Sequence, residues 1–245
     1  MRRIRIFVAY DGTNYCGWQI QPNGITIEEK LNKALNRLTG EDIRVIGASR
    51  TDSGVHALGN VAVFDTESPI PPERFSYALN QRLPEDIVVV KSDEVPLDWH
   101  PRYQDNISKT YEYHIYNAQM PNPLKTRYCT FVSFPLDIGA MREGAKYLIG
   151  AHDFVSFCNI RTNTQDTVRT VYDLTIEKKD DEIVHENHRK WIFVQHGPHY
   201  RRCPDPGRQR VLYSGKSKRD SGSQSPYFRR GHSIAKRTGI GKNRL

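Results

Sequence analysis

In the first part of the chain, segments with the hydrophobic spacing of a β-strand alternate with segments that have the spacing of an α-helix. The order of these segments is compatible with few folds. Apolar and polar residues alternate in Arg3–Tyr10, as they do in a β-strand with one buried face. The run Thr26–Gly40 instead places apolar side chains at helical spacing, between a capping threonine and a terminating glycine. Further strands are expected at 44–48, 60–65 and 87–92, and a second helix at 71–82. The order β, α, β, β, α, β predicts a ferredoxin-like lobe, an antiparallel sheet with helices on one face.

A second set of similar elements begins near Asn106. Residues 108–117 alternate as a strand, 136–148 have helical spacing, and 168–178 return to a strand pattern. After about Ile183 neither period is sustained, and the composition is typical of a disordered segment. We therefore predict an α+β fold of two ferredoxin-like lobes, the second incomplete. The N-terminal lobe is expected at 1–105, the C-terminal lobe at 106–183 and a disordered basic tail at 184–245.

The positive charge is concentrated at the C-terminal end. The net charge is +8, but residues 184–245 contain 15 of the 36 Lys and Arg and 3 of the 28 Asp and Glu. The tail therefore carries +12, and the preceding residues carry −4. A basic groove in the first three quarters of the chain must come from local placement of charge rather than from its sum.

Composition also argues against several kinds of site. The cysteines lie apart, with no C-x-x-C pair and no histidine cluster, so we expect neither a disulfide framework nor a metal site. No apolar run approaches the roughly 20 residues that span a membrane, and the first residues lead directly into a strand pattern. No membrane segment and a cytoplasmic location are expected. The four cysteines are Cys16, Cys129, Cys158 and Cys203.

Asp52 is the leading candidate for chemistry. It lies in SRTDSGVHA (49–57), a polar loop between two predicted strands, where catalytic side chains are often mounted. Arg50 and His56 flank it, and a positive neighbour favours an ionised, nucleophilic carboxylate near neutral pH. The alternative is that Asp52 only caps the turn through its own backbone.

Aromatic residues offer surfaces on which a base can stack. Tyr111 and Tyr113 alternate on one predicted strand and share a face, but paired tyrosines are also ordinary residues of a strand core. Stacking contributes roughly 1–3 kcal/mol per base. The loop Tyr10–Gln19, rich in aromatic and amide groups, fits either RNA contacts or a turn around a buried tryptophan. Phe154 and Phe157 are interpreted as packing residues.

Three stretches together resemble one enzyme family. YDGTNYCGWQIQ (10–21), SRTDSGVHA (49–57) and KTYEYHIYN (109–117) occur in the order and approximate spacing of bacterial tRNA pseudouridine synthase A enzymes. LNQRLPEDI and HDFVSF support the resemblance, which extends from the first strand to about Ile183. It implies a two-lobed pseudouridine synthase fold. It also implies a homodimer that isomerises uridines 38, 39 and 40 of the tRNA anticodon arm without a cofactor.

The resemblance assigns roles to particular residues. The catalytic aspartate of the family falls on Asp52, and its base-stacking tyrosine falls on Tyr111. Arg50 and Lys109 are candidates for phosphate contacts in RNA, the alternative being that they are solvated surface charges. The family usually has Phe where this chain has Trp99, an exchange that we expect the fold to tolerate.

The C-terminal end departs from the family pattern. The family carries a strand that reads approximately G-N-G-F-L-Y-N-M-V-R, whose arginine is thought to pair with the catalytic aspartate, and this strand is missing here. When RKWIFVQHGP (189–198) is reverse-translated and read one base later, suitable synonymous codons give G-N-G-F-L-F-N-M-V and then an arginine codon. We infer a frameshift at about Ile183 to His185, in the gene or in its sequencing.

Two hypotheses follow. The first is an isomerase that flips a uridine out of tRNA and attacks it through Asp52. The second is an inactive, frameshifted remnant that at most binds RNA, because loss of the final strands would expose a sheet edge and apolar surface. On both hypotheses the tail from Val184 is expected to be mostly exposed coil, with a short strand near Trp191–Gln195. It is also expected to supply no basic partner for Asp52.

Overall fold

The computed structural model describes residues 1–103, 108–154, 168–190 and 233–236. The chain divides into two compact units. The first contains Met1–Thr110 and Ile234–Leu245, and the second contains Tyr111–Ser233. Among the described residues, no helix combines the length and the apolar character needed to cross a membrane.

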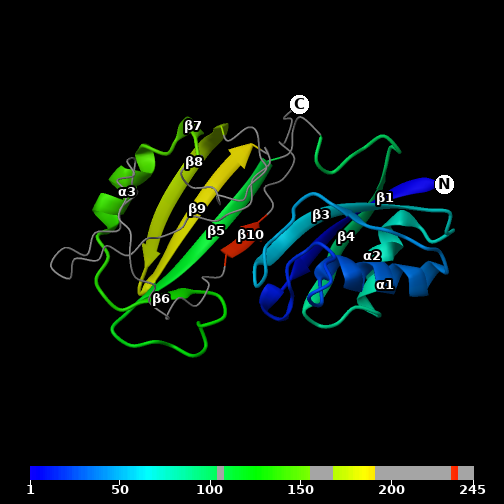
Figure 1. Cartoon of the computed structure of the whole chain (residues 1–245), viewed down its shortest axis with the longest axis horizontal. Helices are drawn as coiled ribbons and strands as arrows, with labels where there is room; N and C mark the ends of the chain where they lie inside the picture. Colours follow the sequence, from blue (N-terminus) through cyan, green and yellow to red (C-terminus); the bar gives the residue numbers. More distant parts are fainter. Residues whose placement is uncertain (104–107, 155–167, 191–232, 237–245) are drawn as a thin grey trace. The chain divides into compact units, whose positions relative to one another are not determined.

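The first unit is a split β-α-β arrangement with both α-helices on one face of the sheet (Figure 1). The strand order is β4-β1-β3, with the short β2 added on β3, and these pairs are all antiparallel. This order is that of a ferredoxin-like lobe and confirms the predicted fold class. The elements are β1 (Arg2–Tyr10), η1 (Gly12–Asn14), α1 (Ile27–Thr39), β2 (Ile46–Gly47), β3 (His56–Thr66), η2 (Pro72–Arg74), α2 (Phe75–Asn80) and β4 (Ile87–Val95).

Helix α1 begins and ends where its sequence indicates. The Thr26 side chain accepts a hydrogen bond from the Glu29 backbone N–H, and Gly40 ends the helix in a left-handed conformation with φ of 78°. Helix and sheet bury one apolar core between them, because the inward positions of β1 meet the apolar stripe of α1. Fully buried members of this core include Ile4, Ile6, Val8, Ile27, Leu31, Leu35, Phe75 and Leu79.

The sheet of the first unit differs from the prediction in two details. The strand predicted at 44–48 is reduced to the two residues of β2, since Ile43 N–H and Val45 N–H donate to the side chains of α1 instead of to a neighbouring strand. A short strand, β10 (Ser233–Lys236), pairs with the start of β3 in parallel.

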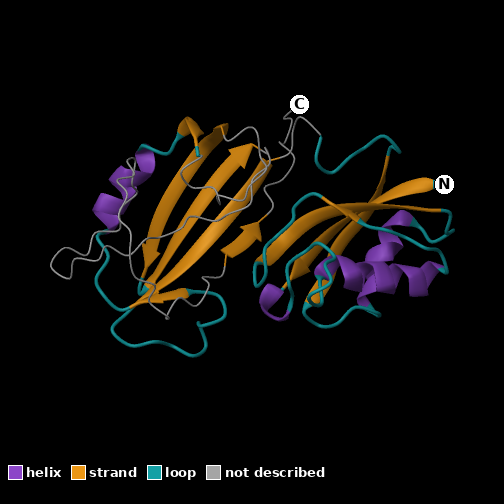
Figure 2. Ribbon diagram, viewed as in Figure 1, coloured by secondary structure: helices purple, strands orange, loops and turns teal. Residues whose placement is uncertain are grey.

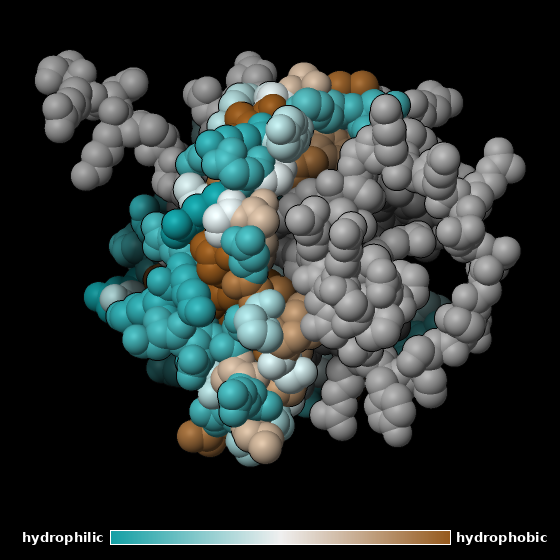
Figure 3. Space-filling view, turned by 90° about the vertical axis from the view of Figure 1, so that its left-hand side faces the viewer, coloured by the Kyte–Doolittle hydropathy of each residue, from teal (hydrophilic) through white to brown (hydrophobic). Residues whose placement is uncertain are grey.

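The second unit is a sheet with α3 packed against it, as the ribbon diagram shows (Figure 2). The strand order is β5-β9-β8-β7, and β6 pairs with β5 in parallel. Of the described residues visible on the side where α3 lies, most are hydrophilic, with hydrophobic areas between them (Figure 3). The elements are β5 (Ser108–Asn117), β6 (Thr130–Val132), α3 (Ile138–Lys146), β7 (Gly150–Asp153), β8 (Val168–Lys179) and β9 (Glu182–Lys190).

The regular backbone does not end at Ile183. Strand β9 continues to Lys190, and its pairing with β8 extends to Arg189, so the expectation that the pattern stops near Ile183 is wrong for the backbone. Strand pairing uses main-chain groups, which every residue except proline supplies in full. The strand predicted near Trp191–Gln195 lies outside the described residues, as does most of the tail.

The side chains of β9 fit their places poorly just after Ile183. His185 is 3% exposed, and its Nε2 has no hydrogen-bond partner. The Oδ1 atom of Asn187 is also buried without a partner, and no other orphaned side-chain atom is found in the described residues. Leaving a buried polar group unsatisfied costs about 1–3 kcal/mol. Both orphaned atoms therefore lie directly downstream of the inferred frameshift.

The shifted reading frame replaces both residues that carry the orphaned atoms. Any codons for residues 184–188, read one base later, encode Met or Thr at position 185 and Ile or Thr at position 187. Met or Ile at these positions would complete the apolar face that Ile183 begins, because residues two apart on a strand point to the same side. The structure thus supports the frameshift hypothesis on grounds independent of the family motif.

We predict that His185→Met stabilises the second unit, by roughly 1–3 kcal/mol at neutral pH, because it removes the orphaned nitrogen. Burial lowers the pKa of His185 from 6.5 to about 4, so the unfolded chain binds the proton more tightly. Stability is therefore greatest above pH 6.5 and falls as the pH drops toward 4, by roughly 3 kcal/mol in all. Urea unfolding monitored across this pH range measures both effects.

His152→Met serves as the control, since His152 is only partly buried, on strand β7. It should leave the acid-induced loss of stability in place. An unchanged pH profile in His185→Met would contradict the assignment of that loss to His185.

Candidate active site

Asp52 lies in the loop that joins β2 to β3, and its side chain is exposed. Within the described part of the chain, its carboxylate has no hydrogen-bond or ion-pair partner. The turn is closed by the backbone, since the Val55 N–H donates to the Asp52 carbonyl at 3.2 Å. The carboxylate is therefore available to an external reactant and does not cap the turn.

The loop Tyr10–Gln19 holds the backbone of the Asp52 loop in place. The Trp18 N–H donates to the carbonyl oxygen of Thr51 at 3.0 Å, one residue before the aspartate. In the other direction, the Ser53 hydroxyl and the Gly54 N–H both donate to the Tyr15 carbonyl at 3.2 Å. Hydrogen bonds thus fix the chain on both sides of Asp52.

Glycine allows the two loops to come this close. Gly17 has a φ of 83°, and a Cβ atom there would overlap the carbonyl oxygen of Thr51. A Cβ atom on Gly12 would overlap the carbonyl oxygen of Val55 in the same way. Gly12 and Gly17 therefore allow the backbone of the Tyr10–Gln19 loop to pack directly against the backbone of the Asp52 loop.

The aromatic side chains of Tyr10–Gln19 are structural. Trp18 is 1% exposed, and its indole covers Gly47. The Tyr10 hydroxyl lies 2.8 Å from the Thr51 Oγ1 atom. The buried Tyr15 hydroxyl donates to Asp86 at 2.5 Å, and burial raises the pKa of Tyr15. Of the two interpretations left open by the sequence, the structure supports the turn around a buried tryptophan.

Three cations gather where β2 enters the Asp52 loop. The Arg102 Nε atom donates to the Gly47 carbonyl at 2.8 Å, and the Lys109 Nζ atom donates to the Ala48 carbonyl at 3.1 Å. Burial, and then the charge of Arg50, lower the pKa of Arg102. Positive charge therefore gathers at the start of the Asp52 loop, although residues 1–110 carry a net charge of −2.

Arg102 was missed by the sequence analysis. It lies on the segment that follows β4, and its approach to β2 is a long-range contact that no local pattern signals. Its neighbour Trp99, where the family usually has Phe, lies beside Arg5, whose guanidinium is 5.2 Å from the ring centroid. The aromatic exchange at this position keeps an ordinary cation–π contact.

His56 has a different role from the one expected. It is 4% exposed, and its Nδ1 atom lies 3.0 Å from Asp11 Oδ1 and 3.2 Å from the Gly12 backbone nitrogen. Because a carboxylate accepts and an amide N–H donates, Nδ1 can satisfy one of them at a time, according to its protonation. His56 thus ties the start of β3 to the Tyr10–Gln19 loop.

The two candidate tyrosines belong to the second unit, on β5. Tyr113 packs against the core of that unit, donates to or accepts from the Thr130 hydroxyl at 2.7 Å, and has a pKa raised by burial. Tyr111, nearer the start of the strand, is half-buried. The structural interpretation therefore holds for Tyr113, and the stacking role of Tyr111 stays a prediction.

Comparison with known proteins identifies the family. Residues 6–104 and 145–198 match the family model described as tRNA pseudouridine synthase. Proteins named tRNA pseudouridine synthase A are similar over three quarters of both chains. They include those of Thermoanaerobacter sp. (strain X514), 50% identical over 183 residues, and Brevibacillus brevis (strain 47), 46% identical over 183 residues. A protein of that name from Clostridium acetobutylicum is 42% identical over 184 residues.

The chain belongs to the tRNA pseudouridine synthase family. Enzymes of this family are isomerases, and the two-unit α+β fold is consistent with their fold. The first matched segment contains the Asp52 loop together with the Tyr10–Gln19 loop that holds it. The second matched segment of the family model extends to residue 198, past the inferred frameshift.

We predict that Gly17→Ala severely reduces the pseudouridine synthase activity that depends on the Asp52 loop. The new Cβ atom would push against the backbone next to Asp52, and a displacement of about 1 Å can cost on the order of 100-fold in rate. The effect is measured by steady-state kinetics and thermal unfolding of the frame-restored protein. This is the protein encoded when the gene is read one base later from the inferred frameshift at about Ile183 to His185.

Gly40→Ala is the matched control, because Gly40 has a similar φ of 78° and its Cβ atom would meet nothing within 4 Å. Both variants pay for a left-handed alanine, at roughly 1 kcal/mol, so only the loss in Gly17→Ala beyond that in Gly40→Ala reports the contact between the loops. Equal losses in the two variants would contradict the proposed packing.

Proposed function

We propose that this protein isomerises uridine to pseudouridine at positions 38, 39 and 40 of the tRNA anticodon arm. Asp52 is the nucleophile, Tyr111 stacks on the target base, and Arg50 and Lys109 contact phosphates. The enzyme works without a cofactor, as a homodimer in the cytoplasm. The observation that carries the proposal is an exposed, unpaired carboxylate on a loop whose backbone is fixed on both sides.

The chemistry follows from what an ionised carboxylate can do to a flipped-out uridine. Asp52 attacks the ribose or the base, and the bond between N1 and C1′ breaks. The detached uracil turns within the site and forms a new bond between C5 and C1′. The C5 hydrogen leaves as a proton, and N1 takes up a proton. Asp52 leaves C1′ as the C5–C1′ bond forms if it attacked the ribose, and leaves the base last if it attacked the base. The product has the same atoms as the substrate, so the reaction requires no oxidant and no further reactant.

The local charge suits an RNA substrate. Arg50, Arg102 and Lys109 surround the entry to the Asp52 loop, where a tRNA backbone must pass for its base to reach the carboxylate. Phosphate contacts of this kind position the nucleic acid without reading its sequence. Lys109 also donates to the Ala48 carbonyl, so its loss would affect the loop as well as RNA affinity.

One observation favours the inactive remnant for the chain as printed. The orphaned side chains on β9 weaken the packing of the second unit, which contains Tyr111. The family arginine is also replaced by other residues in this reading frame. We therefore expect the frame-restored protein to be much more active than the printed chain.

The proposal predicts tritium release from tRNA labelled at C5 of uridine, because the C5 hydrogen is lost when the new bond forms. The frame-restored protein should release tritium from the anticodon arm, and Asp52→Asn should reduce the rate by at least about 10⁴-fold, as removal of a nucleophile does. Asp42→Asn, on a loop that follows α1, is the matched control and should keep the parent rate.

The position of pseudouridine in the product tRNA tests the proposed substrate positions separately from the isomerase activity itself. Pseudouridine mapped to positions 38 to 40 supports the stated substrate, whereas pseudouridine elsewhere in tRNA would retain the activity and refute the site. Full activity in Asp52→Asn would refute the assignment of Asp52 as the nucleophile. Inactivity of the frame-restored protein would favour the hypothesis of an inactive remnant.

A further inference from the structure

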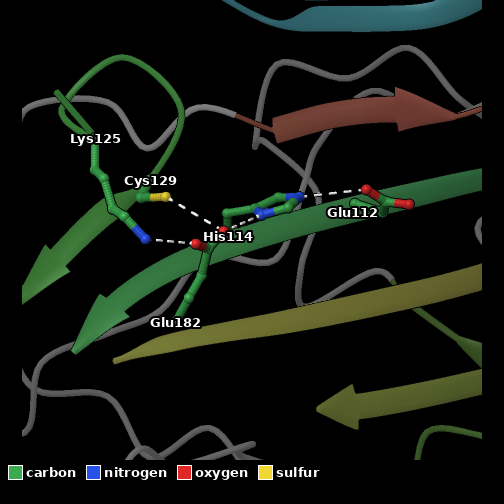
Figure 4. A network of polar contacts seen from close by, with 5 residues as sticks. All are labelled: Glu112, His114, Lys125, Cys129 and Glu182. Atoms are coloured by element: carbon green, nitrogen blue, oxygen red, sulfur yellow. Dashed lines mark hydrogen bonds and ion pairs between the residues drawn. The ribbon is translucent and has the colours of Figure 1, made fainter. Parts of the chain in front are cut away.

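A group of metal-binding side chain types lies on the second unit, apart from the Asp52 loop. His114 is on β5, Cys129 directly precedes β6, and Glu182 is the first residue of β9 (Figure 4). The residues on either side of His114 in β5 pack into the core on the α3 side. Because successive side chains of a strand point to opposite faces, His114 lies on the other face of the sheet. His114 and Glu182 lie on paired strands and Cys129 lies just before a third, so the side chains meet only because those strands pair.

The ligand atoms already have nearly the separation that a tetrahedral metal requires. The nearest nitrogen of His114, the sulfur of Cys129 and a carboxylate oxygen of Glu182 lie within 4.8 Å of one another. His114 Nδ1 is 2.9 Å from Glu182 Oε1, and the Cys129 sulfur is 3.8 Å from the same oxygen. Zinc bonds of about 2.0–2.3 Å in a tetrahedron put neighbouring ligand atoms about 3.3–3.8 Å apart. The His114–Glu182 pair would have to open by about 0.4 Å, and the widest of the three pairs, at up to 4.8 Å, would have to close by about 1 Å.

The surroundings of His114 also match those of a metal ligand. Its other ring nitrogen, Nε2, lies 3.3 Å from the carboxylate of Glu112, which is 8% exposed. A ligating histidine usually gives its second N–H to a carboxylate or carbonyl, which fixes the orientation of the ring. Glu112 occupies that position, so that Nδ1 is directed at Glu182 and Cys129.

Lys125 competes with a metal for Glu182. Its Nζ atom lies 2.8 Å from Glu182 Oε2, whereas the contacts of His114 and Cys129 are to the other oxygen, Oε1. The carboxylate can therefore ligate through Oε1 while the ammonium stays near Oε2. Burial raises the pKa of Cys129 to about 11, so binding must release the thiol proton to solvent.

We propose that His114, Cys129 and Glu182 form a zinc-type divalent metal site that ties β5, β6 and β9 together. The mixed nitrogen, sulfur and oxygen donor set is one that zinc favours, and a water molecule or added ligand takes the fourth position. No metal was expected from the sequence, because its four cysteines are not closely spaced. Here the donors are brought together by strand pairing alone.

The test uses the full printed chain, reduced and without a polyhistidine tag, titrated with Zn²⁺ against a chromophoric chelator and separately with Co²⁺. We expect one metal bound at micromolar or tighter affinity, and a thiolate-to-cobalt absorption band. Each cysteine is replaced by serine in turn. Only Cys129→Ser should abolish the band, whereas Cys16→Ser, Cys158→Ser and Cys203→Ser should keep it.

Two further variants separate a metal site from an ordinary ion-pair network. Glu182→Gln should weaken zinc binding by about 100-fold or more, since even supporting residues of metal sites are worth 10–100-fold. Lys125→Met should leave zinc affinity unchanged or raise it, because the competing ammonium is gone. Zinc should raise the thermal unfolding temperature of the parent chain and of Lys125→Met, but not of Cys129→Ser.

Three results would overturn the proposal. These are no binding at micromolar zinc, a cobalt–thiolate band that survives Cys129→Ser, and zinc affinity that is unaffected by Glu182→Gln. Because serine is close in size to cysteine, loss of the band in a Cys129→Ser chain with an unchanged metal-free unfolding temperature cannot be attributed to misfolding.

Discussion

The contact between two backbone loops is the constraint on which the candidate active site depends. The Trp18 N–H binds the carbonyl of Thr51, and Gly17 packs on the same peptide unit. Asp52 follows directly, so its Cα position is set by main-chain geometry rather than by contacts of its own side chain. An exposed carboxylate on a rigid backbone can be both accessible and well oriented, which is what a nucleophile requires.

Parts of this arrangement could be predicted from the sequence, because they depend on local patterns. The helix Ile27–Thr39 follows from its capping threonine, its apolar spacing and its terminal glycine. The importance of Asp52 was indicated by its loop. The contacts of Arg102 and His56 could not be predicted, since each depends on a residue distant in sequence and on the register of strand pairing. The role of Tyr10–Gln19 was left open for the same reason, because a loop rich in tyrosine and tryptophan can face RNA or the core.

Strand β9 shows why a change of reading frame can preserve a backbone and damage a core. Main-chain pairing with β8 continues to Arg189 because it does not depend on which side chains follow Ile183. The inward positions do depend on them, and there His185 and Asn187 bury polar atoms without partners. The loss of sequence periodicity after Ile183 coincides with these unpartnered atoms, but the strand itself continues to Lys190.

Trapping of the reaction intermediate tests the central claim, that Asp52 is the reacting group presented by this loop. Fluorine at C5 of uridine cannot leave as a proton, which blocks the last step. An enzyme–tRNA adduct should then accumulate when Asp52 attacks the base, from which it is released last. We predict that the frame-restored protein, incubated with tRNA containing 5-fluorouridine, gives a covalent adduct that peptide mass spectrometry maps to Asp52. An adduct on another residue, or one that forms equally well in Asp52→Asn, would contradict the account.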